Sequence, residues 1–120
     1  MKKILIVDDE PNIIMSLEYA LKKNGFEVFV ARDGQEALDI LTKKIPDLVL
    51  LDVMMPNVDG YETLQQIKLN NKLSEVKVVF LSAKNKTTDI EKGLELGAVA
   101  YITKPFSLKK IISEINQLLD

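Results

Sequence analysis

The strongest constraint on the fold is a short apolar run that ends in an acid. Leu48–Leu51 is apolar at every position, without the alternation of a strand that has one solvent-facing side, and Asp52 follows it directly. Such a run predicts a strand buried on both faces, as in parallel sheets covered by helices. Because Pro56 and Gly60 break the chain just beyond, we expect the Asp52 carboxylate at the carboxyl edge of the sheet, where open α/β sheets bind ligands.

The order of patterns along the chain predicts a doubly wound α/β fold. Short apolar runs alternate five times with segments of helical periodicity, which is typical of a parallel sheet with helices on both faces. The predicted strands are residues 4–7, 27–31, 48–52, 76–81 and 100–103. The predicted helices begin at Pro11, after Asp33, near Gly60, at Thr88 and after Ser107. We expect residues 1–120 to form one domain.

The fourth helix is predicted from its cap and its apolar face. Thr88 and Glu91 have the three-residue spacing of a capping box, and Gly97 is suited to end the helix. Ile90 and Leu94 are four residues apart, which places them on one side of a helix. We therefore expect both side chains to face the core.

Two absent residue types narrow the chemistry. The chain has no cysteine and no histidine, which excludes disulfides, thiolate catalysis and sites built on imidazole. Arg32 is the only arginine among 16 basic residues, and no basic block occurs, so we expect no direct binding of nucleic acid. No apolar run reaches the length of a signal peptide or a membrane span, which favours a cytoplasmic protein without a membrane partner.

Polar residues gather where the predicted strands end. Asp8 and Asp9 follow the first strand, Asp52 ends the third, Ser82 follows the fourth, and Lys104 follows the fifth. Right-handed crossovers bring these ends to one edge of the sheet. Each residue alone also suits a turn or a helix cap, but crowded carboxylates favour Mg²⁺, and a hydroxyl and an ammonium suit phosphoryl oxygens. Together they suggest aspartyl-phosphate chemistry.

Four segments carry these residues in order along the chain. They are residues 6–11 (Ile-Val-Asp-Asp-Glu-Pro), 51–60 (Leu-Asp-Val-Met-Met-Pro-Asn-Val-Asp-Gly), 81–84 (Leu-Ser-Ala-Lys) and 97–106 (Gly-Ala-Val-Ala-Tyr-Ile-Thr-Lys-Pro-Phe). Over its whole length the chain resembles the receiver domain of two-component response regulators. The resemblance implies a flavodoxin-like, doubly wound, five-stranded parallel sheet with the strand order 2-1-3-4-5.

The resemblance implies that the acid cluster is a phosphorylation site. Asp52 would accept a phosphoryl group from a sensor histidine kinase, a phosphotransfer protein or a small phosphodonor. Asp8, Asp9 and Asp52, with the backbone carbonyl of Met54, would hold Mg²⁺ as the cofactor. The domain would be a regulatory phosphoprotein rather than an enzyme, although it would assist its own phosphorylation and dephosphorylation.

The resemblance also implies a switch. Ser82 and Lys104 would contact the phosphoryl group, and Ser82 would act with Tyr101 to change an output surface on the fourth helix, fifth strand and fifth helix. A downstream effector domain or protein would bind that surface, or a second copy of the chain would do so in a phosphorylation-dependent dimer. The Lys104–Pro105 peptide bond would be cis.

Three other functions share parts of this pattern. A flavin-binding protein of the same fold needs hydroxyls and amides in its first loop, where Asp8 and Asp9 repel phosphate unless a metal is bound. An aspartyl phosphatase commonly has a second acid two residues after its nucleophile, where this chain has Met54. A degenerate receiver that only binds partners would lack the full acid, hydroxyl and lysine set.

The family often has threonine where this chain has Ser82. The side chain at this position of the implied switch therefore keeps its hydroxyl but has one methyl group fewer.

Overall fold

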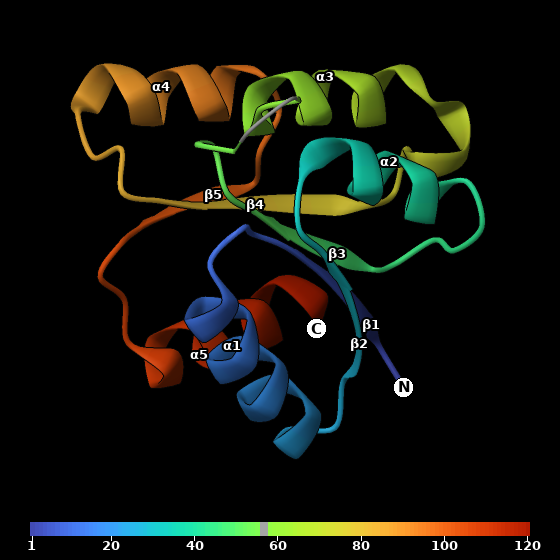
Figure 1. Ribbon diagram of the computed structural model, residues 1–120, viewed down its shortest axis with the longest axis vertical. Coiled ribbons are helices and arrows are strands. Elements are labelled where there is room, and N and C mark those ends of the chain that lie inside the picture. The colour runs from blue at the N-terminus through green and yellow to red at the C-terminus, as the bar shows by residue number, and fades with distance from the viewer. Residues whose placement is uncertain (56–57) are drawn as a thin grey trace.

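Five parallel strands form one sheet in the order β2-β1-β3-β4-β5 in the computed structural model, which describes residues 1–55 and 58–120 (Figure 1). The strands are β1 (Lys3–Val7), β2 (Glu27–Ala31), β3 (Leu48–Leu51), β4 (Lys77–Ser82) and β5 (Ala100–Thr103). The helices are α1 (Pro11–Lys23), α2 (Gly34–Leu41), α3 (Gly60–Leu69), α4 (Thr87–Glu95) and α5 (Leu108–Leu119), with a short 3-10 helix η1 (Asn71–Leu73). The predicted fold class and strand order are confirmed, while the predicted break at Pro56 lies outside the described residues.

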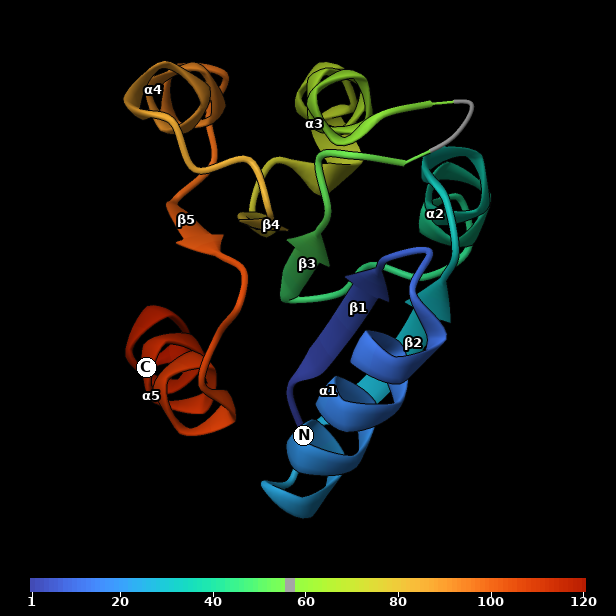
Figure 2. The same ribbon diagram turned by 60° about the vertical axis from the view of Figure 1, so that its left-hand side comes forward.

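Helices cover both faces of the sheet and form two separate cores. Figure 2 shows α2, α3 and α4 on one side of the sheet and α1 and α5 on the other. Successive residues of β3 point to opposite faces, so Val49 and Leu51 pack in the first core and Leu48 and Leu50 in the second. Because both faces are covered, every residue of β3 is buried, which explains the continuous apolar run.

Side-chain caps fix the starts of two helices as predicted. The Asp33 carboxylate accepts a hydrogen bond from the Glu36 N–H at 2.8 Å, and the Ser107 hydroxyl accepts one from the Lys110 N–H at 3.3 Å. α2 ends at Leu41, and the chain turns there towards β3. In the described parts of the chain, none of the helices is long and apolar enough to cross a membrane.

The predictions for α4 were wrong in two respects. The helix begins at Thr87 and its N-cap residue, Lys86, makes no side-chain cap, so Thr88 lies inside the helix instead of capping it. Leu94 is 44% exposed, and the buried residue of this helix is Gly93. A Cβ atom on Gly93 would lie 2.9 Å from Cδ2 of Phe80, so the missing side chain lets α4 rest directly on aromatic rings. This close approach decides which side of α4 faces the core.

Another close approach holds the start of α3 against the end of β3. The N–H of Gly60 donates a hydrogen bond to the carbonyl of Val53 at 3.0 Å. A Cβ atom at Gly60 would lie 2.3 Å from the carbonyl oxygen of Asp52, which is far inside van der Waals contact. Only glycine therefore allows the helix to begin this close to the strand end that carries Asp52.

We predict that Gly60→Ala lowers the free energy of unfolding by about 2 kcal/mol or more, because the backbone of Asp52 and Val53 must move to admit the methyl group. Urea denaturation monitored by circular dichroism would measure the change. Gln65→Ala, at an exposed position of the same helix, is the matched control and should shift stability by less than about 0.5 kcal/mol. Equal stabilities for the two variants would contradict the close contact.

Candidate functional site

Two buried acids lie side by side where β1 and β3 end. The N–H of Asp8 donates to the carbonyl of Ala31 at 3.1 Å, and the N–H of Asp52 donates to the carbonyl of Val7 at 2.9 Å. These hydrogen bonds extend the strand pairing by one residue, so both carboxylates lie at the carboxyl edge of the sheet. Asp8 is 1% exposed and Asp52 is 3% exposed, which is unusual for ionisable side chains unless they are paired.

The ammonium group of Lys104 balances these charges. Its Nζ lies 3.0 Å from Oδ2 of Asp8, 3.1 Å from Oε1 of Glu10 and 3.4 Å from Oδ2 of Asp52. The N–H of Lys104 donates to the carbonyl of Ser82 at 2.8 Å, which fixes the start of the side chain beside β4. One cation from β5 therefore joins acids that follow β1 and β3.

Glu10 is the member of this cluster that the sequence reasoning did not single out. It lies directly after Asp8 and Asp9, where an acid before Pro11 suits the first turn of a helix equally well. Its contact with Lys104 depends on how the chain turns into α1, which the residue pattern does not specify. The one available signal was its position next to two acids already assigned to the site.

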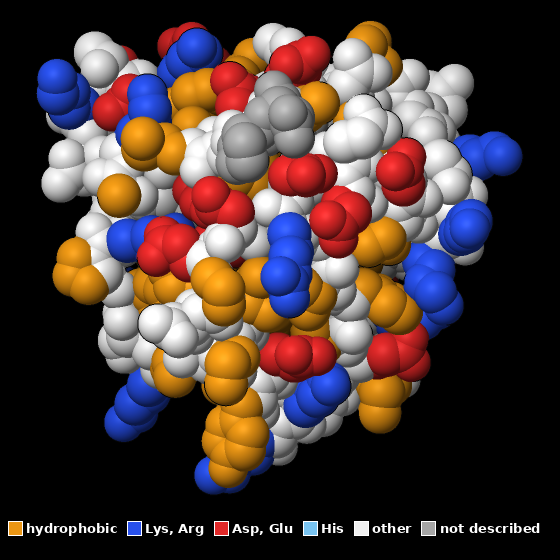
Figure 3. All heavy atoms as spheres, in the orientation of Figure 1, with side chains coloured by type: hydrophobic (Ala, Val, Ile, Leu, Met, Phe, Trp, Pro, Cys, Tyr) orange, Lys and Arg blue, Asp and Glu red, His pale blue; other side chains and the backbone are white. Residues whose placement is uncertain are grey.

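The acids of the cluster offer an oxygen-only binding site. Carboxylate oxygens of Asp8, Asp9, Glu10 and Asp52 all lie within 4.8 Å of one another. A hard cation such as Mg²⁺ prefers such ligands, so the donor set fits the predicted ion. In the space-filling view, acidic side chains gather across the middle of the visible face, between α2 and α3 above and α1 below (Figure 3). The N–H of Met54 donates to Oδ1 of Asp52 at 3.2 Å, while metal binding by its carbonyl stays a prediction.

Burial changes the acidity of this cluster. Burial first, and then the neighbouring charge of Asp8, raise the pKa of Asp52 from 3.8 to about 6, although Lys104 opposes the change. Burial also raises the pKa of Asp8. Burial alone would lower the pKa of Lys104, but the hydrogen bond to Asp8 and the charge of Asp52 outweigh it and raise that pKa. Keeping Asp8 and Asp52 ionised therefore costs stability, and the ammonium of Lys104 offsets only part of that cost.

Ser82 and Tyr101 are joined through the backbone of one loop residue. The Ser82 hydroxyl is fully buried and accepts a hydrogen bond from the Lys84 N–H at 3.2 Å. The Tyr101 hydroxyl donates to the Lys84 carbonyl at 2.7 Å, and burial raises the pKa of that phenol. The Tyr101 ring packs on Phe80, with centroids 5.8 Å apart. The end of β4 and the middle of β5 therefore hold the same peptide segment.

Lys104 is followed by a cis peptide bond to Pro105, as expected.

The residues predicted for the site fall into two groups in the described structure. Asp8, Asp52 and Lys104 are in direct contact, and Asp9 lies with them at the exposed rim. Ser82 reaches the same edge of the sheet from β4, but its hydroxyl accepts a hydrogen bond from the loop that follows.

We predict that Asp52→Asn raises the free energy of unfolding of the metal-free protein at pH 7 by about 1–3 kcal/mol. The folded-state pKa of about 6 lies above the ordinary 3.8, so the native protein binds more protons than the unfolded chain in this window. The wild-type protein should therefore lose stability as pH rises from about 4 to 6, and the advantage of the variant should grow over the same range. Urea denaturation with a chelator at pH 4 and pH 7 tests this, and an advantage that is equal at both values would contradict it.

Comparison with known proteins agrees with the fold. The family model described as the response regulator receiver domain matches residues 4–116. Among solved structures, a chemotaxis protein of Vibrio cholerae is 28% identical, with a TM-score of 0.93 and 99% of each chain covered. The receiver domain of a histidine kinase from Syntrophus aciditrophicus is 34% identical, with a TM-score of 0.91, 99% of this chain and 90% of that chain covered.

A third structure, the receiver domain of a Francisella response regulator, is 33% identical, with a TM-score of 0.90, 99% of this chain and 97% of that chain covered. The matched region of the family model contains every residue of the candidate site, from Asp8 to Lys104. Fold, strand order and sequence model therefore agree along almost the whole chain. The chain belongs to the response regulator receiver domain family.

Proposed function

We propose that the protein is a phosphorylation-activated signalling switch in which Asp52 accepts the phosphoryl group. The observation that carries the proposal is the buried Asp52 carboxylate, which shares the ammonium of Lys104 with Asp8 at the carboxyl edge of the sheet. Membership of the receiver family implies phosphorylation-dependent signalling in two-component systems. The donor would be a sensor histidine kinase, a phosphotransfer protein or a small phosphodonor.

In the proposed transfer, a carboxylate oxygen of Asp52 attacks phosphorus. A phosphorus–oxygen bond forms, and the bond between phosphorus and the donor's nitrogen or oxygen breaks, so that the leaving group takes the electron pair. The Asp52 pKa of about 6 leaves the carboxylate mostly ionised at pH 7, as a nucleophile requires. Lys104 is already 3.4 Å from Oδ2 of Asp52, so its ammonium can pair with the new phosphoryl oxygens without crossing the site.

The acid cluster is proposed to hold Mg²⁺ through Asp8, Asp9 and Asp52, with the Met54 carbonyl as a further ligand. When bound, the ion would screen the charge of the incoming phosphoryl group from the surrounding carboxylates. Two observations support this proposal. The carboxylate oxygens lie within 4.8 Å of one another, and the burial of Asp8 and Asp52 is unfavourable without a second cation. Asp9 is exposed, so it can bind an ion that keeps water ligands.

The output is proposed to pass through Ser82 and Tyr101. A phosphoryl group adds charge and acceptor oxygens beside Ser82, and any movement of that hydroxyl acts on the Lys84 backbone that Tyr101 also binds. The face formed by α4, β5 and α5 would then bind an effector domain or protein, or support a phosphorylation-dependent dimer.

We also propose that residues 1–120 form one regulatory domain that assists its own phosphorylation and dephosphorylation. The domain would act in the cytoplasm, where its phosphodonors are made.

We predict that incubation with acetyl phosphate and Mg²⁺ adds the mass of one phosphoryl group to the wild-type protein. Asp52→Ala should remain unlabelled, and wild-type protein with excess chelator should show almost no adduct, because both the nucleophile and the screening cation are required. Intact-protein mass spectrometry measures the shift. Asp59→Asn is the matched control, since Asp59 caps α3 nearby and asparagine keeps that cap. Wild-type labelling of Asp52→Ala would refute the assignment.

We also predict that beryllofluoride with Mg²⁺, which stands in for the phosphoryl group, shifts backbone amide resonances of residues 82–86 and 101–104. These segments contain the side chains that meet at Lys84 and the lysine that contacts Asp52. Leu38 and Leu41 of α2 lie beside the opposite part of the sheet and should shift little. Two-dimensional NMR measures both regions, and shifts of equal size in α2, or none near Tyr101, would overturn this route.

A further inference from the structure

The helix α4 buries little side chain against the rest of the protein. Within the part of the chain that the structure describes, Gly93 is the buried residue of α4, and Lys86 at the N-cap makes no side-chain cap. A Cβ atom on Gly93 would lie 2.9 Å from Cδ2 of Phe80 and 3.0 Å from Cδ2 of Tyr101. A helix that buries so little changes position easily, so individual contacts from its neighbours decide where α4 lies.

Tyr61 makes such contacts from the first turn of α3. Its hydroxyl donates a hydrogen bond at 3.2 Å to the carbonyl of Asp89, in the first turn of α4. The ammonium of Lys92, also on α4, lies 4.4 Å from the centroid of the Tyr61 ring, which is within the range of a cation–π contact. Tyr61 therefore contacts α4 through its hydroxyl and through its ring.

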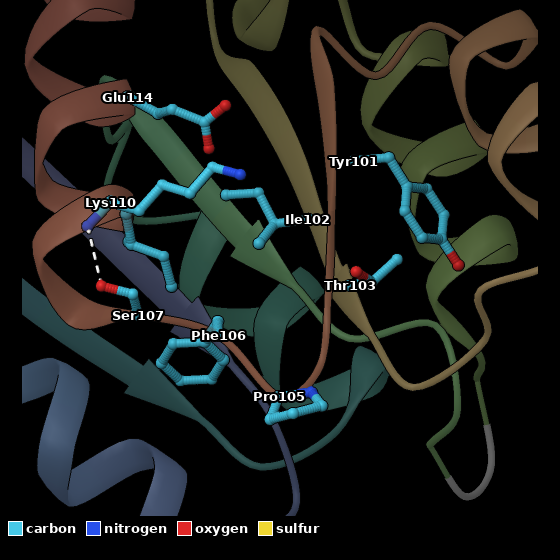
Figure 4. A pocket seen from close by; sticks show the side chains of 9 residues that line it. Tyr101, Ile102, Thr103, Pro105, Phe106, Ser107, Lys110 and Glu114 are labelled. Carbon is cyan, nitrogen blue, oxygen red and sulfur yellow. Dashed lines mark hydrogen bonds between the residues drawn. The ribbon is translucent and has the colours of Figure 1, made fainter.

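Tyr61 and Tyr101 belong to one row of aromatic side chains. The Tyr61 and Phe80 rings form an edge-to-face pair with centroids 5.4 Å apart, and Phe80 in turn packs on Tyr101. Figure 4 shows Tyr101 on the opposite side of β5 from Ile102, and its ring belongs to the core that α3 helps to form. The row therefore runs from α3 across β4 to β5, beneath α4.

The two phenol hydroxyls bind the chain before and after the start of α4. Tyr101 donates to the carbonyl of Lys84 in the preceding loop, and Tyr61 donates to Asp89 in the helix. Burial first, and then the neighbouring Tyr101, raise the pKa of Tyr61 to about 12, so its hydroxyl remains a donor at neutral pH. An apolar side chain of similar size would fill the same part of the core but would not donate this bond.

Tyr61 is also close to the strand end that carries Asp52. It follows Gly60, whose N–H donates to the carbonyl of Val53 and which lies against the carbonyl oxygen of Asp52. Because this contact leaves no free space, a change in the backbone at Asp52 acts directly on the first turn of α3. Phosphorylation of Asp52 and binding of Mg²⁺ by the Met54 carbonyl would both act on that backbone.

We propose that Tyr61 is a positioning residue that passes the change at Asp52 to α4, by a route separate from Ser82 and Tyr101. The route runs from the backbone of Asp52 through the first turn of α3 to the first turn of α4. The inference rests on the proposed function, because it gives the phosphorylation switch a second connection to its output face. Ser82 acts on the loop before α4, whereas Tyr61 acts on the helix itself.

The variant Tyr61→Phe distinguishes this role from a purely structural one. It keeps the ring that packs on Phe80 and contacts Lys92, and it removes only the hydroxyl that binds Asp89. If Tyr61 is only a core residue, the variant should lose stability to urea but respond to phosphorylation as the wild-type protein does. If Tyr61 positions α4, the response of α4 itself should change.

The test measures the amide shifts that Mg²⁺ and beryllofluoride cause in each protein, by two-dimensional NMR. In wild-type protein we expect residues 88–93 to shift together with residues 82–84. In Tyr61→Phe the shift of residues 88–93 should fall to about half or less, because a bond that moves α4 is lost, while residues 82–84 should shift as in wild type. Tyr19→Phe, at a 70% exposed position on α1, is the matched control and should resemble wild type in both regions.

The outcomes separate this route from the proposed function. If residues 52–54 and 82–84 of the wild-type protein do not shift, the proposed function fails and the Tyr61 route fails with it. If they shift, but residues 88–93 stay unchanged in wild type or respond at least as strongly in Tyr61→Phe, only the Tyr61 route is overturned. A loss of equal proportion in both regions of Tyr61→Phe would also overturn it, because the hydroxyl would then act on the whole site.

Discussion

The contact between Lys104 and three carboxylates is the interaction on which the functional edge of this protein depends. Asp8 and Asp52 are almost fully buried, and two buried anions on adjacent strands would repel one another strongly without a cation. Lys104 reaches them from β5, at the far side of β4, and it also pairs with Glu10. The arrangement therefore ties together the ends of β1, β3 and β5, which are far apart in the sequence.

The ammonium of Lys104 does not fully balance the carboxylates around it, and this incomplete charge balance suits a switch. One ammonium faces several carboxylates, and the pKa of Asp52 stays near 6 in spite of it, so the ionised cluster is held at a cost in stability. A site optimised for stability alone would replace such charges with apolar side chains. The cost is consistent with a site whose charge balance is completed by a ligand, because ligand binding is favoured most where the free state is poorly satisfied.

Most of the fold and the core of the site could be predicted from the sequence. A strand buried on both faces has no alternation, so the run before Asp52 was sufficient to place that residue at the sheet edge. The failures occurred where packing outweighed local pattern. Thr88 and Leu94 fit a regular amphipathic helix, but Gly93 lies against Phe80 and turns the helix so that Leu94 faces outward. The absence of a side chain carries no hydrophobic signal, so periodicity could not show this contact.

The same physical reason accounts for the site residue that the sequence did not indicate. Glu10 is an ordinary acid beside a helix start, and nothing in its spacing distinguishes it from a solvated charge. It gains its role when the chain that turns into α1 brings it to Lys104. That contact depends on the neighbours that tertiary packing supplies. Lys104 follows β5 directly and contacts Asp52, so the charge balance at Asp52 acts on the strand that carries Tyr101.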